Sequence, residues 1–247
     1  MADGRSVRVA RRLGFPTVTP GESQRSPRKS DPGWSVRRPL AEWLRSEGST
    51  VAGKRVLDVG CGSKPYQPFF ATAASYIGVD VQENALADLH GAIEALPVED
   101  SSFDVVLCTQ VLEHVDDPAA AVRELHRVTA PGGRVLASTH GTQVYHPNPG
   151  DHWRWTHTGL ERLFMTNGDW ERVDVEPNAG TTSALAMLVA RSLHLLAKRA
   201  GVAFAARPLV YALNASAAAI DAHVPSLREK RAGALFANFH VTAEKRA

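Results

Sequence analysis

Two stretches of the sequence carry side chains that could do chemistry. The first is the run "RVLDVGCG", in which a short apolar segment contains Asp58 and leads directly into Gly60, Cys61 and Gly62. A strand that ends in glycines predicts a nucleotide cradle, because glycine lets the backbone approach a ligand and a following helix start offers free N–H groups. The next apolar run, "SYIGVD", ends in Asp80. Its carboxylate could accept both hydroxyls of a ribose.

The glycine spacing argues against a dinucleotide site. The dinucleotide motif needs a third glycine three residues after the second, and this sequence has Pro65 there. A nicotinamide-dependent dehydrogenase is therefore disfavoured. A tight strand–helix turn without any ligand is the structural alternative for this motif.

The second stretch, "HGTQVYHPNPGDHWRWTH", holds four of the ten histidines and two of the five tryptophans of the chain. A metal site would need ligands at a characteristic spacing, such as His-x-x-x-His on a helix. No such template fits the five candidate ligands His140, His146, Asp151, His152 and His157. We therefore expect no metal here.

Two interpretations of the second stretch are left. Trp153 and Trp155 could pack it onto the body of the protein, with Asp151 paired to Arg154. Alternatively, residues 140–157 form a lid that excludes water and shapes an acceptor pocket. The lid interpretation makes six side chains candidates for substrate binding: Tyr145, His146, His152, Trp153, Arg154 and Trp155.

An alternating pattern of strands and helices must position both stretches. Residues 103–108 read as a buried strand, and Asp116 or Asp117 is expected to cap a helix with Pro118 in its first turn. "APGG" is expected to end that helix, and "RVLAST" reads as another strand. Alternation of this kind predicts a parallel sheet covered on both faces. Ligands of such sheets bind beyond the carboxyl ends of the strands, where residues 140–157 begin.

Two connections in this pattern are irregular. Pro65 and Pro68 predict a short or distorted helix after the glycines. Only eight residues, 81–88, separate Asp80 from a third strand near residues 89–92, fewer than a helical crossover needs. The second helix is therefore expected to be lost, which leaves that side of the cleft open.

In their order and spacing, the pieces "VLDVGCG", "YIGVD", "LPVEDSSFDVV", "VLEHV" and "ELHRVTAPGGRVL" resemble the class I S-adenosylmethionine-dependent methyltransferases, in particular the type 11 methyltransferase domains. The resemblance covers about residues 54–140. It implies an α/β fold: a Rossmann-like, doubly wound sheet of seven strands, mostly parallel with an antiparallel last strand. The segment "HPNPGDHWRWTHTGLERLF" is also similar to a subgroup that accompanies carbohydrate or secondary-metabolite pathways.

The resemblance implies S-adenosyl-L-methionine as cofactor and a small molecule as methyl acceptor. O-methylation of a sugar or secondary metabolite is expected, with N-methylation as an alternative. A different class of function is a cofactor-binding partner subunit without catalysis. Nine residues are expected around the cofactor: Asp58, Gly60, Cys61, Gly62, Asp80, Val81, Ala92, Ile93 and Gln110.

Each part of the cofactor has its expected neighbours under this resemblance. The glycine loop would lie under the methionine part, Asp80 would hold the ribose, and Gln110 would lie near the sulfonium. Ala92 stands where the family usually has an acidic residue facing adenine. The backbone N–H of Ile93, or the side chain of Glu94, would have to replace it.

A hydroxyl acceptor also needs a base whose pKa lies near the working pH, and histidine is the natural choice. His114 follows the fourth strand and His140 ends the fifth, so both are candidates, together with Glu113. Glu113 and His114 could instead be a capping pair at a helix start. The sequence does not select one base.

The chain outside the core divides into three parts. Residues 1–38 hold nine basic and three acidic residues, diluted by Pro, Ser, Gly and Thr. We expect residues 1–33 to be a disordered basic leader and residues 34–247 a methyltransferase domain. Its core would be residues 54–177 and 234–245, with Thr158 capping a helix and the last segment supplying the antiparallel strand.

Residues 180–224 read as apolar, poorly amphipathic helices inserted before the last strand. They could cap the substrate pocket, form a homodimer interface, or contact a membrane surface or a lipid-like substrate, because helices apolar on most faces must be buried against something. No nucleic-acid partner is expected. No apolar run is long enough to span a membrane, and the two cysteines fit a reducing cytoplasm rather than a disulfide framework.

Overall fold

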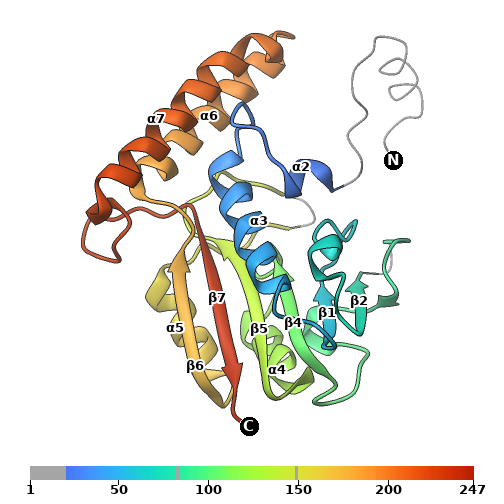
Figure 1. The fold of residues 1–247 in the computed structure, drawn as a ribbon. Coiled ribbons are helices and arrows are strands. Elements are labelled where there is room, and N and C mark those ends of the chain that lie inside the picture. Colours follow the sequence, from blue (N-terminus) through green and yellow to red (C-terminus); the bar gives the residue numbers. More distant parts are fainter. Residues whose placement is uncertain (1–20, 82–83, 148–149) are drawn as a thin grey trace.

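A single seven-stranded sheet forms the centre of the protein (Figure 1). The computed structural model describes residues 21–81, 84–147 and 150–247. The strands are β1 (Arg55–Val59), β2 (Ser75–Asp80), β3 (Leu89–His90), β4 (Phe103–Thr109), β5 (Thr129–His140), β6 (Trp170–Pro177) and β7 (Asn238–Lys245). Their order is β3-β2-β1-β4-β5-β7-β6, and β7 runs antiparallel to both of its neighbours. The predicted fold class, including the antiparallel last strand, is confirmed.

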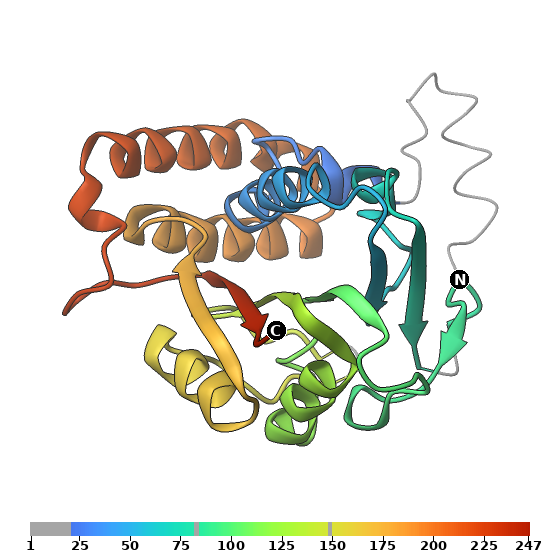
Figure 2. The same cartoon turned by 60° about the horizontal axis from the view of Figure 1, so that its bottom comes forward.

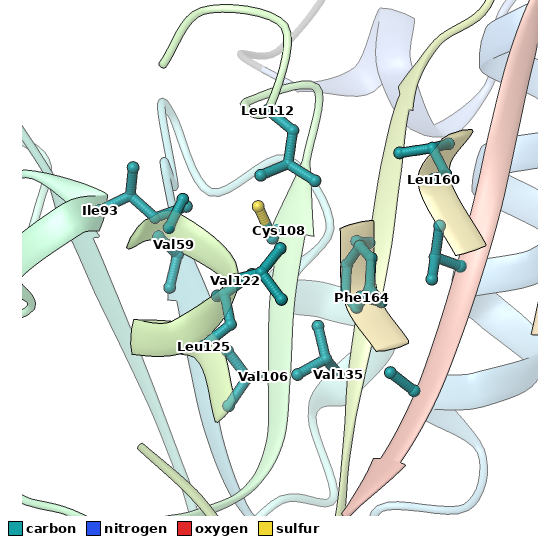
Figure 3. Close-up of a cluster of buried hydrophobic side chains, with 14 of the residues drawn as sticks. Val59, Ile93, Val106, Cys108, Leu112, Val122, Leu125, Val135, Leu160 and Phe164 are labelled. Atoms are coloured by element: carbon teal, nitrogen blue, oxygen red, sulfur yellow. The ribbon is translucent and has the colours of Figure 1, made fainter. Parts of the chain in front are cut away.

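Helices cover both faces of the sheet (Figure 2). α4 (Pro118–Val128) and α5 (His157–Thr166) pack on one face, and α3 (Trp34–Gly48) packs on the other. Alternate residues of the buried strands serve the two faces, as a period of two requires. On β4, Val106 belongs to the core under α4 and α5, whereas Leu107 belongs to the core under α3. Figure 3 shows the first of these cores.

The start of α4 lies close to where the sequence predicts it. The carboxylate of Asp117 accepts hydrogen bonds from the backbone N–H groups of Ala119 and Ala120, at 2.9 and 3.0 Å, and Pro118 occupies the first turn. Asp117 is therefore the cap, rather than Asp116. A capping side chain of this kind stabilises a helix by about 1 kcal/mol.

Two predicted boundaries are wrong. The helix ends at Val128 and β5 begins at once, so "APGG" lies inside the strand. Thr129 pairs with Phe103 across a register shift, which the positive φ of Gly132 (69°) helps the chain to make. The cap of α5 is Thr156, not Thr158, because the Thr156 hydroxyl accepts the N–H of Gly159 at 3.1 Å.

The two irregular connections are confirmed. Only a 3-10 turn, η1 (Gln67–Phe70), follows the glycines. Within the described part of residues 81–88 the chain makes turns and no helix before the two-residue strand β3. A second 3-10 turn, η2 (Ile93–Ala95), follows β3. In the described residues, no helix between β2 and β3 therefore closes the side of the cleft next to β2.

A helical hairpin occupies the expected insertion. It consists of α6 (Thr181–Arg199), η3 (Ala203–Ala206), α7 (Arg207–His223) and η4 (Pro225–Leu227), and it lies beside α3 beyond the carboxyl ends of the parallel strands (Figure 1). The carboxylate of Asp221 on α7 accepts the N–H groups of Thr182 and Ser183 at the start of α6. By length and composition alone, the described stretch Ala203–His223 is apolar enough to cross a membrane.

The described part of the predicted leader differs from expectation. Residues 21–33 include the short helix α2 (Glu22–Arg25) and pack on the body. The Arg25 guanidinium donates to the carbonyl of Pro65 at 2.7 Å, and the Asn214 amide donates to the carbonyl of Lys29 at 2.7 Å. These contacts use backbone carbonyls, which leave no periodic pattern in the sequence. The remaining leader, residues 1–20, lies outside the described residues.

Candidate active site

A cavity of about 770 Å³ opens at the carboxyl ends of β1, β2, β4 and β5. Its volume lies within the range of small-molecule sites. The loops after these strands form its floor, and α2, α3 and α6 contribute to its outer wall. All nine residues predicted to surround the cofactor line this one cavity.

The glycine loop forms the floor near β1. Gly60 has a φ of 68°, and a Cβ at this position would lie 2.3 Å from Val111 Cγ2, so only glycine fits. Gly62 has a φ of 52°, and a Cβ there would meet no atom within 4 Å. The N–H groups of Gly60 and Cys61 both donate to the carbonyl of Val79, at 2.8 and 3.1 Å. The loop is thus tied to β2 while its outer edge is open to the cavity.

Asp80 stands at the end of β2 with a fixed carboxylate. Oδ2 accepts the N–H of Gly62 at 2.9 Å and the side-chain amide of Asn84 at 2.7 Å, and Oδ1 accepts the N–H of Val81 at 2.8 Å. A carboxylate has about four acceptor positions. One position on Oδ1 is therefore left for a ligand hydroxyl.

Two titratable groups beneath the loop are buried. Burial raises the pKa of Asp58 to about 7, although the Tyr76 hydroxyl donates to its Oδ2 at 2.6 Å and acts against that rise. Burial also raises the pKa of the Cys61 thiol to about 12. Cys61 is therefore a neutral thiol at physiological pH, and it shapes the loop rather than acting as a nucleophile.

Ala92, Ile93 and Glu94 form the wall where adenine is expected. Gln110, after β4, has a positive φ of 59°, and its side-chain amide donates to Ser138 Oγ and to Asn238 Oδ1, both at 3.0 Å. The amide of Gln110 is therefore held by β5 and β7, and its backbone lines the centre of the cavity.

The three predicted base candidates meet at the other end of the cavity. Glu113 is fully buried, and its Oε2 accepts the Thr139 hydroxyl at 2.8 Å. Its Oε1 lies 3.3 Å from His140 Nε2 and 3.9 Å from His114 Nε2. His114 Nδ1 is hydrogen-bonded to the carbonyl of Gly150. The turn after β4 and the end of β5 thus bring one carboxyl and two imidazoles together.

Burial shifts the two innermost groups in opposite directions. It raises the pKa of Glu113 to about 7 and lowers the pKa of His140 to about 3. Both shifts favour the uncharged form, as a low-dielectric site requires. His140 is therefore a weak base, whereas Glu113 ionises in the physiological range.

The described residues of the segment 141–156 are anchored on this cluster. The N–H groups of His152 and Trp153 both donate to the carbonyl of Glu113, and the N–H of Trp155 donates to the carbonyl of His140 at 3.0 Å. The indole N–H of Trp153 donates to the carbonyl of Val115 at 2.8 Å, and its ring stacks on Trp155 at 5.6 Å. Both tryptophans therefore pack the segment onto the body.

Of the six predicted substrate-binding residues, the structure places only His146 in the wall of the cavity. Tyr145 is three-quarters exposed. Arg154 forms a two-pronged ion pair with Asp151, at 2.5 and 2.7 Å, as the packing interpretation expects. His152, Trp153 and Trp155 lie outside the lining of the cavity.

Some residues of the site carry no clear signal in the sequence. Arg37 on α3 and Arg191 on α6 line the cavity although their helices come from outside the core motifs. Thr139 could have been found, since it lies at the carboxyl end of β5. In the part of the chain that the structure describes, no group of three or more His, Cys, Asp or Glu side chains could hold a metal ion.

Comparison with known proteins gives a consistent picture. A model of a methyltransferase domain matches residues 57–137. An enzyme of Ralstonia nicotianae named ubiquinone biosynthesis O-methyltransferase is 37% identical over 151 residues, which cover 51% of this chain and 63% of that protein. A protein of the same name from Bordetella bronchiseptica is 39% identical over 113 residues, or 39% and 47% of the two chains. This chain thus spans between about half and just under two thirds of the length of these curated relatives.

Solved structures share the fold at low identity. The [4+2]-cyclase SpnF has a TM-score of 0.57 and 19% identity, over 86% of this chain and 82% of its own. Phosphoethanolamine N-methyltransferase 2 of Haemonchus contortus, solved with S-adenosyl-L-methionine, has a TM-score of 0.54 and 16% identity, over 95% of this chain and 61% of its own. Together with the matched domain, the order and direction of the seven strands give this chain the Rossmann-like fold of class I S-adenosylmethionine-dependent methyltransferases.

Proposed function

We propose that this protein transfers a methyl group from S-adenosyl-L-methionine to an oxygen atom of a small molecule. One observation carries the proposal. A single cavity holds a glycine loop and Asp80 at one end and the cluster of Glu113, His114 and His140 at the other. Methyl transfer needs these two halves together, because the acceptor must attack in line with the methyl–sulfur bond.

The residues of the first half fit the cofactor. The open edge of the loop at Gly62 gives the methionine part access to the backbone. The free position on Asp80 Oδ1 suits a ribose hydroxyl, and a second hydroxyl would compete with Asn84 for Oδ2. Ala92 and Ile93 offer adenine an apolar wall. When bound, the cofactor supplies an activated methyl group, so the protein contributes mainly position.

Electrostatics favours His114 as the base. Its Nδ1 is engaged by the carbonyl of Gly150, which leaves Nε2 as the acceptor nitrogen in the neutral ring. Nε2 lies 3.9 Å from Glu113, so above the pKa of Glu113, about 7, a proton taken from the acceptor hydroxyl would give an imidazolium beside a carboxylate. His140 is disfavoured because its low pKa makes it a weak base.

Positioning of the cofactor and the acceptor would supply the rest of the rate acceleration. Holding two reactants in a near-attack geometry can remove roughly 7–11 kcal/mol of barrier. The segment of residues 141–156 and the wall from α2, α3 and α6 would exclude water from the reacting atoms.

The class of acceptor is proposed only broadly. The names of the relatives favour O-methylation of a small molecule, and they give no support to the sugar or secondary-metabolite class expected from residues 146–164. Because this chain spans only part of those relatives, their substrate is not transferred to it. A cytoplasmic location, a homodimer through residues 180–224 and the absence of a nucleic-acid partner stay proposals as well.

A product assay tests the proposal. The protein is incubated with S-adenosyl-L-methionine and a panel of hydroxylated and aminated small molecules, and release of S-adenosylhomocysteine is measured. Release that depends on a hydroxyl acceptor and falls at least tenfold in His114→Ala supports the proposal. Tight cofactor binding without turnover on any acceptor class would favour a non-catalytic partner subunit. A reaction that leaves the methyl group on the cofactor would contradict methyl transfer, and the same fold in SpnF makes that outcome worth measuring.

A further inference from the structure

Two arginines in the wall of the cavity have no counter-charge among the residues that the structure describes. Arg37 of α3 and Arg191 of α6 both line it. Neither forms a hydrogen bond or an ion pair with any other described side chain; Arg37 is exposed, whereas Arg191 is half-buried and its Nε atom is buried without an acceptor. Buried guanidinium groups are normally paired, because an unpaired one loses its hydration without replacement.

The surroundings of Arg191 add more positive charge. A Cβ at Gly33 would lie 3.2 Å from Nη2 of Arg191 and 3.8 Å from Nε of Arg37, so both guanidinium groups converge on this glycine. Gly33 is the N-cap of α3, and the first turn of that helix holds no acidic residue. The helix dipole therefore adds its positive end to the pair. Burial and the charge of Arg37 together lower the pKa of Arg191.

The charges of Arg37 and Arg191 act on different groups in the wall of the cavity. Burial raises the pKa of Tyr66, beside the glycine loop, to about 12, and the charge of Arg37 acts against that rise. Burial lowers the pKa of His140, and the charge of Arg191 adds to that effect. Arg191 therefore acts on one member of the base cluster.

We propose that Arg191, assisted by Arg37, forms a subsite for a carboxylate or phosphate group of the methyl acceptor. An anion there would pair with two guanidinium groups at the positive end of a helix, and it would supply the acceptor that the buried Nε lacks. The substrate of the proposed methyltransferase is then an anionic small molecule whose hydroxyl points toward His114. This inference rests on the proposed function, since it concerns the acceptor of that reaction.

The carboxylate of the cofactor is the other source of the same chemistry. The acceptor is favoured because Arg191 lines the same cavity as the base cluster and its charge acts on His140 of that cluster. The experiment must separate the two sources by filling the cofactor position first.

Calorimetric titration of protein saturated with S-adenosylhomocysteine makes this separation. The probes are inorganic phosphate, benzoate and benzamide, of which the last two match in shape and differ in charge. The variants are Arg191→Ala, Arg191→Lys and, as a matched control on the exposed end of the same helix, Arg199→Ala. Melting temperatures establish that each variant is folded.

We expect the saturated wild type to bind phosphate or benzoate at least tenfold more tightly than Arg191→Ala does. Arg191→Lys should recover part of the loss, because it keeps the charge but not the planar fork, and Arg199→Ala should match the wild type. Benzamide should not distinguish the proteins. The preferred anion identifies the group on the acceptor as phosphate or carboxylate.

Three results would overturn the inference. Arg191→Ala could weaken S-adenosylhomocysteine binding tenfold while that ligand displaces the anions, which would assign the pair to the cofactor. Arg199→Ala could reduce anion binding as much as Arg191→Ala, which would show general surface attraction. The saturated wild type could bind neither anion. If the wild type does not bind S-adenosylhomocysteine at all, the proposed function fails instead, and the ligand-free protein still reports whether the anion subsite exists.

Discussion

At the scale of single residues, burial is the largest cause of the pKa shifts of Glu113, Asp58 and His140 in this cavity. It holds Glu113 and Asp58 protonated up to about neutral pH and keeps His140 unprotonated far below it. His114, with 15% of its side chain exposed, is the least buried of the three base candidates. The base that we propose is therefore the one whose proton can be exchanged with an acceptor and with solvent.

The substitution Glu113→Gln should reveal the effect of burying Glu113 as a pH-dependent difference in stability between the variant and the wild type. The pKa of Glu113 in the folded protein, about 7, lies above its ordinary value. The contribution of the buried, neutral side chain to folding stability is therefore fully present at low pH and is lost as the pH rises through about 7. The wild type should therefore lose stability relative to Glu113→Gln between about pH 5 and pH 8. Urea unfolding at both pH values measures the difference. Comparing the two proteins matters, since buried His140 has the opposite pH dependence. A difference in stability that does not change with pH would contradict the burial argument.

Gly60→Ala should destabilise the loop for two separable reasons. The positive φ of 68° costs alanine about 1–2 kcal/mol, and its Cβ would also collide with Val111. The double variant Gly60→Ala/Val111→Ala relieves only the collision, so it should regain part of the stability lost beyond Val111→Ala alone. Melting temperatures and denaturant midpoints report this. A Gly60→Ala variant as stable as the wild type would show that the loop is not held as described.

At the scale of elements, the regular parts of the fold could be predicted because they follow from periodicity and strong end signals. A continuous apolar run identifies β4 as a buried strand, and Asp117 with Pro118 marks the start of α4. "APGG" was misread because glycine and proline suit a strand irregularity as well as a helix end. The cavity wall from α3 and α6 could not be predicted, since nothing in the sequence shows which distant helix covers which loop.

The same limit applies to the segment of residues 141–156. The sequence shows the composition of this segment but not which of its side chains face the cavity. In the structure His146 lines the cavity, whereas the two tryptophans pack outside it. Its backbone contacts with Glu113 and His140 leave no sequence pattern at all. That the nine residues expected around the cofactor line one cavity could be predicted, because a strand end fixes where the next few residues must lie.

His146→Ala and His152→Ala form a matched pair on this segment. His146 lines the cavity and its ring lies 5.9 Å from that of His114, whereas His152 lies outside the lining. We expect His146→Ala to lower kcat/KM for an acceptor about tenfold, or ~1.4 kcal/mol, and His152→Ala to change it little. Steady-state kinetics with saturating cofactor measures both. Equal losses in the two variants would mean that the segment acts as a unit rather than through His146.

At the scale of the whole molecule, the N-terminal segment completes the site. Gln24 lines the cavity, and residues 25–31 bond to the loop at Pro65 and to Asn214 of α7. The segment therefore joins the glycine loop to the helical hairpin, two parts far apart in the sequence.

Two truncations test this connection. Removing residues 1–20 leaves every described contact in place, so melting temperature and cofactor affinity should stay close to those of the full chain. Removing residues 1–32 deletes three side-chain hydrogen bonds to the body and one cavity wall residue, and it should lower the melting temperature by several degrees. Circular dichroism melts of the three chains show the difference. Identical melts for both truncations would show that residues 21–32 do not stabilise the fold.

The most direct test of the central claim is a calorimetric titration of S-adenosylhomocysteine into the wild type and Asp80→Ala. We expect one site per chain in the wild type. In a folded Asp80→Ala we expect the affinity to be weaker by about 1.5–3 kcal/mol, or roughly tenfold to a hundredfold, because hydrogen bonds to a charged acceptor are lost. Circular dichroism must show that the variant keeps its fold, since Asp80 also holds Gly62 and Asn84. No binding to the wild type, or equal affinity in the folded variant, would contradict the claim that this cavity holds the cofactor with its ribose at the end of β2.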